Sequence, residues 1–172
     1  MPLIYITGSS GAGKSTVRKE LQKLGYEAHD TDEDGYSGWV NIKTKLAVKL
    51  PPDSKRPQGW LEEHAYILSA VKVTELVERA KDKKIFLSGI PANDIDFFEV
   101  FDKIIFLEID KDTMLHRIKN RENNSFGQSE DSLALILKWF DAIRERYEKA
   151  GAVFIDATKP IHKVTQEVIN NS

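Results

Sequence analysis

The chain has 172 residues, 41% hydrophobic and 30% charged, which is the size and composition of one globular domain with one core. Its formal net charge of −2 leaves no basic excess for gripping a phosphate backbone, which disfavours nucleic acid as a partner. It has no cysteine, which excludes disulfides and cysteine–zinc sites, and its apolar runs are too short to span a bilayer, so we expect a cytoplasmic protein without a membrane partner.

The first predicted element is an apolar strand at 1–7, and a glycine-rich loop with the spacing of a phosphate-binding P-loop follows it. Glycines let the backbone approach a ligand, and successive amides at the start of the next helix, 13–24, form an anion site. Lys14 can reach the β- and γ-phosphates of ATP, and the Ser15 hydroxyl can ligate Mg²⁺. The predicted nucleotide-binding residues are Gly8, Ser9, Ser10, Gly11, Ala12, Gly13, Lys14, Ser15 and Thr16.

The rest of the chain alternates predicted strands with predicted helices. Further strands are expected at 26–29, 85–89, 103–109 and 152–156. Further helices are expected at 60–81, 112–121, 129–149 and 161–170, and 36–50 is also compatible with a helix. This alternation predicts one α/β domain over 1–172, a three-layer P-loop NTPase fold with a mostly parallel five-stranded sheet.

Polar turns follow the second and third predicted strands. An acidic turn at 30–35 follows the second, and Ser88 and Gly89 follow the third. Because the carboxyl ends of parallel strands share one edge, these turns and the P-loop are expected to meet at one crevice. There, Asp30 and Asp32 can hold Mg²⁺ through water and meet an acceptor hydroxyl, and Gly89 lets the backbone approach the substrate.

Over nearly its whole length the chain resembles the small P-loop kinases, the group that includes shikimate kinase, gluconate kinase and the nucleoside monophosphate kinases. The resemblance rests on the P-loop, the acidic pair, the glycine turn, an arginine-bearing segment and the loop after the last strand. It implies transfer of the γ-phosphoryl group of ATP, with Mg²⁺, to a hydroxyl or phosphate of a small molecule. By this resemblance Asp30 positions Mg²⁺ and Asp32 binds or deprotonates the acceptor hydroxyl.

The same resemblance implies a lid at 117–130. Arg117 and Arg121 are four residues apart and share one helical face, where related kinases use arginines to stabilise charge on the transferred group. Arg144, in preference to Arg146, is the candidate substrate arginine of the long helix after the lid.

The acceptor-binding region is expected at 36–64. Arg56 either binds an anionic acceptor there or faces water, and it is counted among the substrate-binding candidates. The aromatic candidates in this region are Trp39, Trp60 and His64, the last two also fitting a packed helical stripe.

Two other functions stay open. One is a nucleoside monophosphate kinase, against which the serine at position 88 argues because those enzymes usually carry an acidic residue there. The other is an ATP-binding regulator without catalysis. The identity of the acceptor, the preference for ATP over GTP, and the choice between a monomer and a homodimer are also open.

Overall fold

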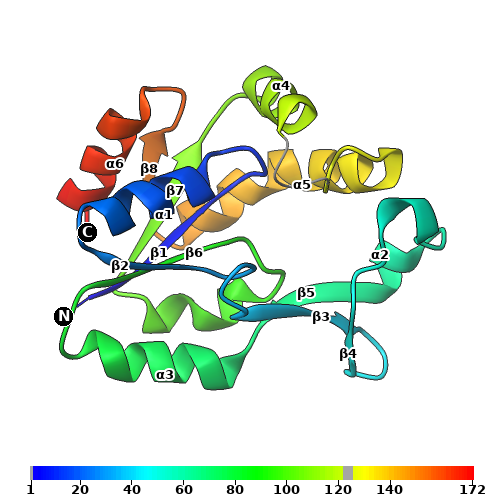
Figure 1. Cartoon of the computed structure of the whole chain (residues 1–172), viewed down its shortest axis with the longest axis horizontal. Coiled ribbons are helices and arrows are strands. Elements are labelled where there is room, and N and C mark those ends of the chain that lie inside the picture. Colours follow the sequence, from blue (N-terminus) through cyan, green and yellow to red (C-terminus); the bar gives the residue numbers. More distant parts are fainter. Residues whose placement is uncertain (1, 122–125) are drawn as a thin grey trace.

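The computed structural model in Figure 1 describes residues 2–121 and 126–172. Its main sheet has five strands in the order β2-β6-β1-β7-β8, and every pairing within it is parallel. The strands are β1 Leu3–Gly8, β2 Glu27–Asp30, β6 Ile85–Ser88, β7 Lys103–Glu108 and β8 Val153–Asp156. The predicted α/β fold with a parallel five-stranded sheet is confirmed.

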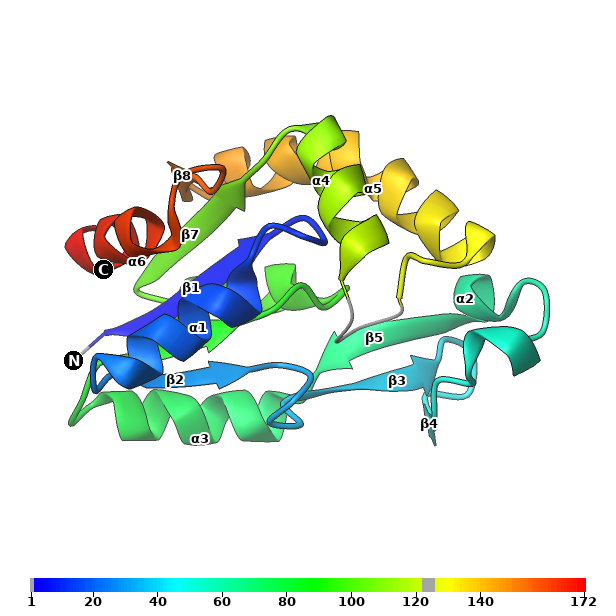
Figure 2. The same ribbon diagram turned by 45° about the horizontal axis from the view of Figure 1, so that its top comes forward.

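Helices cover both faces of this sheet because its strands bury side chains on both sides (Figure 2). Along the central strand β1, Ile4 and Ile6 pack in one buried cluster, whereas Leu3 and Tyr5 pack in the other. None of the helices within the described residues is long and apolar enough to cross a bilayer. The main helices are α1 Lys14–Lys23, α3 Ala70–Ala80, α4 Lys111–Asn120, α5 Glu130–Lys149 and α6 Ile161–Asn170, and η2 Asp94–Val100 is a 3-10 helix.

The segment after the acidic turn forms a second, antiparallel sheet in the order β4-β3-β5, which extends beyond the P-loop edge of the main sheet (Figures 1 and 2). The predicted helix at 36–50 is therefore wrong, and the predicted helix at 60–81 is divided. Trp39 lies opposite Tyr66 across the strands, and such aromatic cross-strand pairing outweighs a helical spacing in the local sequence. The elements here are β3 Ser37–Asn41, β4 Ala47–Val48, η1 Asp53–Lys55, α2 Trp60–Glu63 and β5 His64–Leu68.

Candidate active site

The loop between β1 and α1 has the backbone that its glycines permit. Gly8, Gly11 and Gly13 all have positive φ, at 145°, 79° and 94°. A Cβ added to Gly8 would lie 2.5 Å from the carbonyl oxygen of Leu107, so no larger residue fits there. The loop therefore turns tightly at the end of the central strand and leads into the amino end of α1, where backbone amides favour an anion.

Lys14 arches over this loop. Its Nζ donates to the carbonyl oxygens of Gly8, at 2.7 Å, and Ser9, at 3.0 Å. The pKa of Lys14 is lowered to about 8, mainly by burial, with the charge of Arg121 acting in the same direction and the charges of Asp32 and Asp30 opposing it. A phosphate group at the P-loop would stabilise the charged form of this lysine.

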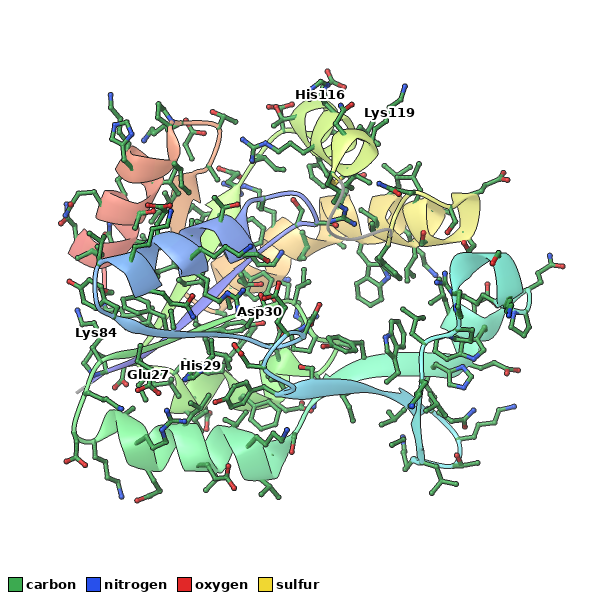
Figure 3. All side chains as sticks on the ribbon, viewed as in Figure 1. Glu27, His29, Asp30, Lys84, His116 and Lys119 are labelled. Atoms are coloured by element: carbon green, nitrogen blue, oxygen red, sulfur yellow. The ribbon has the colours of Figure 1, made fainter. Side chains whose placement is uncertain are left out.

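Asp30 ends β2 and lies buried beside the start of α1. Figure 3 shows Asp30 at the carboxyl end of β2, with His29 and Glu27 directed toward α3, as the alternation of a strand requires. One Asp30 oxygen accepts from Ser88 Oγ at 3.2 Å and from Ser15 Oγ at 3.5 Å.

These oxygen donors fit Mg²⁺, which binds through one or two protein oxygens together with water and substrate phosphates. Within the described residues there is no group of three or more His, Cys, Asp or Glu side chains that could cage a metal ion. The pair of Ser15 and Asp30 therefore suits a cation that arrives with a nucleotide.

Asp32 follows in the same turn, and solvent reaches it. The hydroxyl of Thr31 donates to its carboxylate at 3.1 Å. Desolvation by the surrounding protein nonetheless raises the pKa of Asp32 above its usual 3.8, with the charge of Asp30 acting in the same direction and the nearby hydroxyl of Tyr66 on β5 acting to lower it. A carboxylate with a raised pKa is a better proton acceptor, which is the property a general base needs.

The acidic turn is held by a residue that sequence reasoning missed. Arg18 of α1 is 5% exposed and forms ion pairs with Glu33 and Asp34. Asp34 in turn accepts from the backbone N–H of Asp30 at 2.7 Å, and Asp30 accepts from that of Asp32 at 2.9 Å. The available signal was the position of Arg18 three residues before Leu21, beside the apolar face of the predicted helix, because an arginine buried there needs a carboxylate partner.

Gly89 lies buried where β6 ends, against the acidic turn. A Cβ at this position would collide with the side chain of Thr31. Its N–H donates to Ile6 at 3.0 Å, and its carbonyl accepts from the Tyr5 hydroxyl at 3.1 Å. Gly89 therefore lets two strand ends approach closely, and its predicted contact with substrate stays a prediction.

Arg117 and Arg121 occupy different places. Arg117 donates to the carbonyls of Gly11, at 3.2 Å, and Ala157, at 3.0 Å, and so joins the P-loop to the loop after β8. Arg121 donates to Ser10 Oγ at 3.2 Å and to the backbone carbonyl of Phe126. Of the two, Arg121 is the one whose charge acts on Lys14. Residues 122–125 of the predicted lid lie outside the described residues.

The two remaining arginine candidates are bound to carboxylates. The side chain of Arg56 is 2% exposed and pairs with Asp131 of α5 at 3.2 Å. Arg144 pairs with Glu108 at 2.7 Å and with Glu148 at 3.1 Å on the outer side of α5. The predicted contacts of Arg56 and Arg144 with substrate stay predictions.

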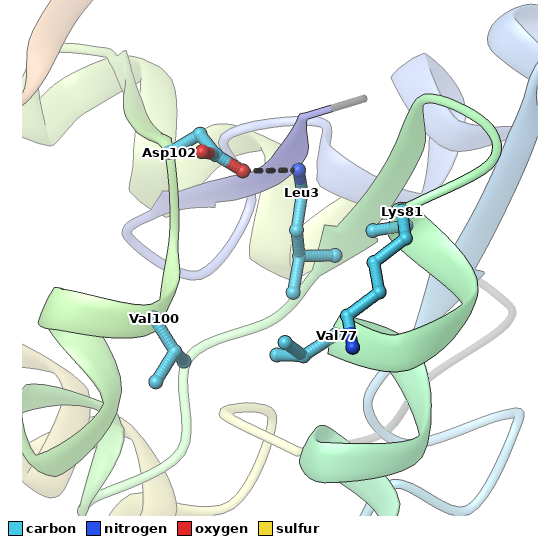
Figure 4. Close-up of a pocket in the computed structure, with 6 residues that line it drawn as sticks. Leu3, Val77, Lys81, Val100 and Asp102 are labelled. Carbon is cyan, nitrogen blue, oxygen red and sulfur yellow. Dashed lines mark hydrogen bonds between the residues drawn. The ribbon is translucent and has the colours of Figure 1, made fainter.

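A hollow of about 240 Å³ lies at the opposite edge of the main sheet (Figure 4). It is lined by residues that include Leu3, Val77 and Val100, and the carboxylate of Asp102 in its wall accepts from the backbone N–H of Leu3 at 2.7 Å. Because ligands of parallel α/β sheets bind beyond the carboxyl ends of the strands, the P-loop edge is the candidate site.

Comparison with known proteins gives the family and the fold relatives of this chain. A family model described as AAA domain matches residues 4–138. A shikimate kinase of Bacillus cereus is 25% identical over 99% of this chain and 95% of its own length. A dephospho-CoA kinase of Streptococcus mutans is 26% identical over 77% of this chain and 79% of its own.

Among solved structures, shikimate kinase from Acinetobacter baumannii in complex with shikimate aligns with a TM-score of 0.59 and 20% identity. The alignment covers 99% of this chain and 92% of that one, and at this identity the likeness concerns the fold. The predicted resemblance to the group of small P-loop kinases is confirmed.

Proposed function

The chain belongs to the AAA domain family, and on that premise we propose that it transfers the γ-phosphoryl group of ATP to a small-molecule acceptor. The observation that carries the proposal is the arrangement at the carboxyl edge of the sheet, where Lys14 donates to the P-loop carbonyls of Gly8 and Ser9, Asp30 contacts Ser15, and the N–H of Asp32 donates to Asp30. A nucleotide-binding loop and a candidate base thus share one site.

Each residue has a chemical task in this proposal. The loop amides and Lys14 bind the β- and γ-phosphates, and Ser15 with Asp30 would hold Mg²⁺, which supplies charge neutralisation at the phosphates. Asp32 accepts the proton of the acceptor hydroxyl, and Arg121 stabilises negative charge on the transferred group. Arg117, bonded to the carbonyls of Gly11 and Ala157, would position the P-loop against the loop after β8.

Replacing Lys14 by Ala tests the proposal. We expect Mg·ATP binding to weaken about 10- to 150-fold, since a charge-assisted hydrogen bond contributes about 1.5–3 kcal/mol. Calorimetric titration of the folded variant measures this, with Lys19→Ala, an exposed position on the same helix, as the matched control. Equal affinity in the Lys14 variant and the parent, or no binding in either, would contradict the proposal.

Nucleotide binding is also expected to depend on pH through Lys14. The pKa of Lys14 is about 8, and a bound phosphate favours its charged form. Above about pH 8, nucleotide binding should therefore be accompanied by uptake of a proton by Lys14. Affinity should be constant below about pH 7 and fall as the pH rises through about 8 to 9. Calorimetry at about pH 8.5 in two buffers of different ionisation enthalpy measures the uptake. Lys14→Arg stays charged and should abolish it, and a parent protein without uptake would refute the assignment.

A further inference from the structure

A series of contacts joins the acidic turn, the second sheet and the P-loop. The backbone carbonyl of Thr31, next to Asp32, accepts from the N–H of Ser37 at the start of β3, and the ring of Tyr66 on β5 lies 5.4 Å from that of Trp39. Trp39 then lies 6.4 Å from the ring of Phe126, just beyond the lid residues that the structure does not describe. The acceptor side of the candidate site is therefore formed by aromatic rings.

The remaining contacts of this series are polar and involve residues of the nucleotide site. The carbonyl of Phe126 accepts from Arg121, and Arg121 also donates to Ser10 of the P-loop. Lys14 belongs to the same loop, and its Nζ donates to the carbonyl oxygens of Gly8 and Ser9. A molecule bound along this series would have phosphates at the P-loop and aromatic faces at the second sheet, with the acidic turn between them.

The rings are held in place by their neighbours. Trp60 packs against Trp39 with centroids 5.2 Å apart, and His64 stacks on Trp60 at 3.9 Å. His64 also contacts the carbonyl of Trp60 at 2.7 Å and the side-chain amide of Asn41 at 3.3 Å. Trp39 is half-buried and keeps a partly exposed surface. A ring that is fixed before the ligand arrives loses little entropy on binding.

The charged side chains near the aromatic rings favour an uncharged acceptor over an anionic one. An anionic acceptor needs a cation that is not already committed, because charge-assisted pairs carry such recognition. In the described part of 36–68, Arg56 is buried against Asp131, and the four lysines are exposed at the surface, where an ion pair contributes little. The aromatic rings and Asp32 instead suit an uncharged molecule with a planar ring and an alcohol.

We propose that the acceptor is an uncharged nucleoside, whose base stacks on Trp39 and whose sugar hydroxyl faces Asp32. This inference rests on the proposed phosphotransferase function. In the reaction, the hydroxyl oxygen bonds to the γ-phosphorus of ATP and the bond from that phosphorus to the β–γ bridging oxygen breaks. The hydroxyl proton passes to Asp32, and ADP leaves. The chain therefore produces a nucleoside monophosphate.

The test is calorimetric titration of the full chain, saturated with Mg²⁺ and a non-hydrolysable ATP analogue so that the nucleotide site is filled. The probes are adenosine, guanosine, cytidine and uridine, compared with AMP, shikimate and gluconate. We expect at least one nucleoside to bind more tightly than all three anions and to be phosphorylated when ATP replaces the analogue.

Variants of Trp39 test whether the nucleoside binds at this ring. Trp39→Leu should weaken nucleoside binding about 5- to 150-fold, the range for one stacked base, without changing affinity for the analogue. Trp39→Phe keeps a stacking face and should remain close to the parent, which separates stacking from misfolding. Trp139→Leu, at a 48% exposed site on α5, is the matched control and should change nothing.

The outcomes separate the two proposals. If the analogue binds but every nucleoside fails, or an anion is preferred, the nucleoside inference is overturned while the phosphotransferase proposal stands. An equal loss of nucleoside affinity in the Trp39 and Trp139 variants also overturns it. If the analogue does not bind but a nucleoside still binds through Trp39, the proposed function fails and the aromatic site remains.

Discussion

Replacing Asp32 by Asn is expected to lower the phosphoryl-transfer rate about 10²- to 10⁴-fold, the range for loss of a positioned general base. Asn keeps the size and can still accept the hydrogen bond from the Thr31 hydroxyl, but it cannot accept a proton at neutral pH. The loss should appear in kcat, with the affinity for Mg·ATP nearly unchanged, because Lys14 and the loop amides remain. Steady-state kinetics with the best acceptor, together with calorimetry of nucleotide binding, measure the two effects.

The pH profile distinguishes a base from a residue that only shapes the site. Because the pKa of Asp32 is raised above 3.8 and catalysis needs the carboxylate, kcat/KM of the parent should fall as the pH drops through that raised value. The Asn variant should lose this acid limb. Asp96→Asn, exposed on η2, is the control. A retained limb in the Asp32 variant, or a rate like that of the parent, would show that transfer does not use Asp32.

The nucleotide half of the site could be predicted because its signals are local. The P-loop motif specifies its own backbone through Gly8 and its own charge through Lys14, within a few residues of sequence. The position of the acidic turn follows from one general rule, since parallel strands end at a shared edge. The contact between Ser15 and Asp30 at 3.5 Å is the direct consequence of that rule.

The acceptor half could not be predicted in the same way. Trp39 and Tyr66 are cross-strand partners 27 positions apart, and nothing local to either residue specifies that pairing. Trp60 and His64 have a helical spacing, yet α2 ends at Glu63 and His64 begins β5. Tyr66 was therefore not a candidate from sequence, since a helix over 60–81 gives it no reason to face Asp32.

The helical spacing of the arginines in the sequence also did not predict the partner of each arginine. Arg117 and Arg121 share a helical face in the sequence, but α4 ends at Asn120, and Arg121 has the extended backbone of its C-cap. Their guanidinium groups consequently reach different parts of the P-loop. Arg144 and Arg146, two residues apart on α5, point to opposite environments, and only the packed structure shows that Arg146 meets a buried carboxylate.

Replacing Arg146 by Ala is expected to lower the free energy of unfolding by about 3 kcal/mol, because Arg146 pairs with the buried carboxylate of Asp94. Asp94 is fully buried and accepts hydrogen bonds from the hydroxyls of Tyr5 and Tyr147 as well as pairing with Arg146. Removing the arginine leaves a buried charge without its cation. The value is at the lower end for such pairs because 23% of the Arg146 side chain is exposed to solvent. Chemical denaturation measures it, and Arg144→Ala, in exposed ion pairs, should barely change the midpoint.

The pH dependence of this loss identifies its cause. Burial raises the pKa of Asp94, and the charge of Arg146 lowers it, so removing the arginine raises the pKa further. A folded-state pKa above the unfolded value gives stability that is lost as pH rises through it, so the defect should be smaller at about pH 4.5 than at about pH 8. Asp94→Asn in the Arg146→Ala background removes the charge and should recover part of the loss. A defect independent of pH, or no recovery in the double variant, would mean that lost packing rather than an uncompensated carboxylate weakens the fold.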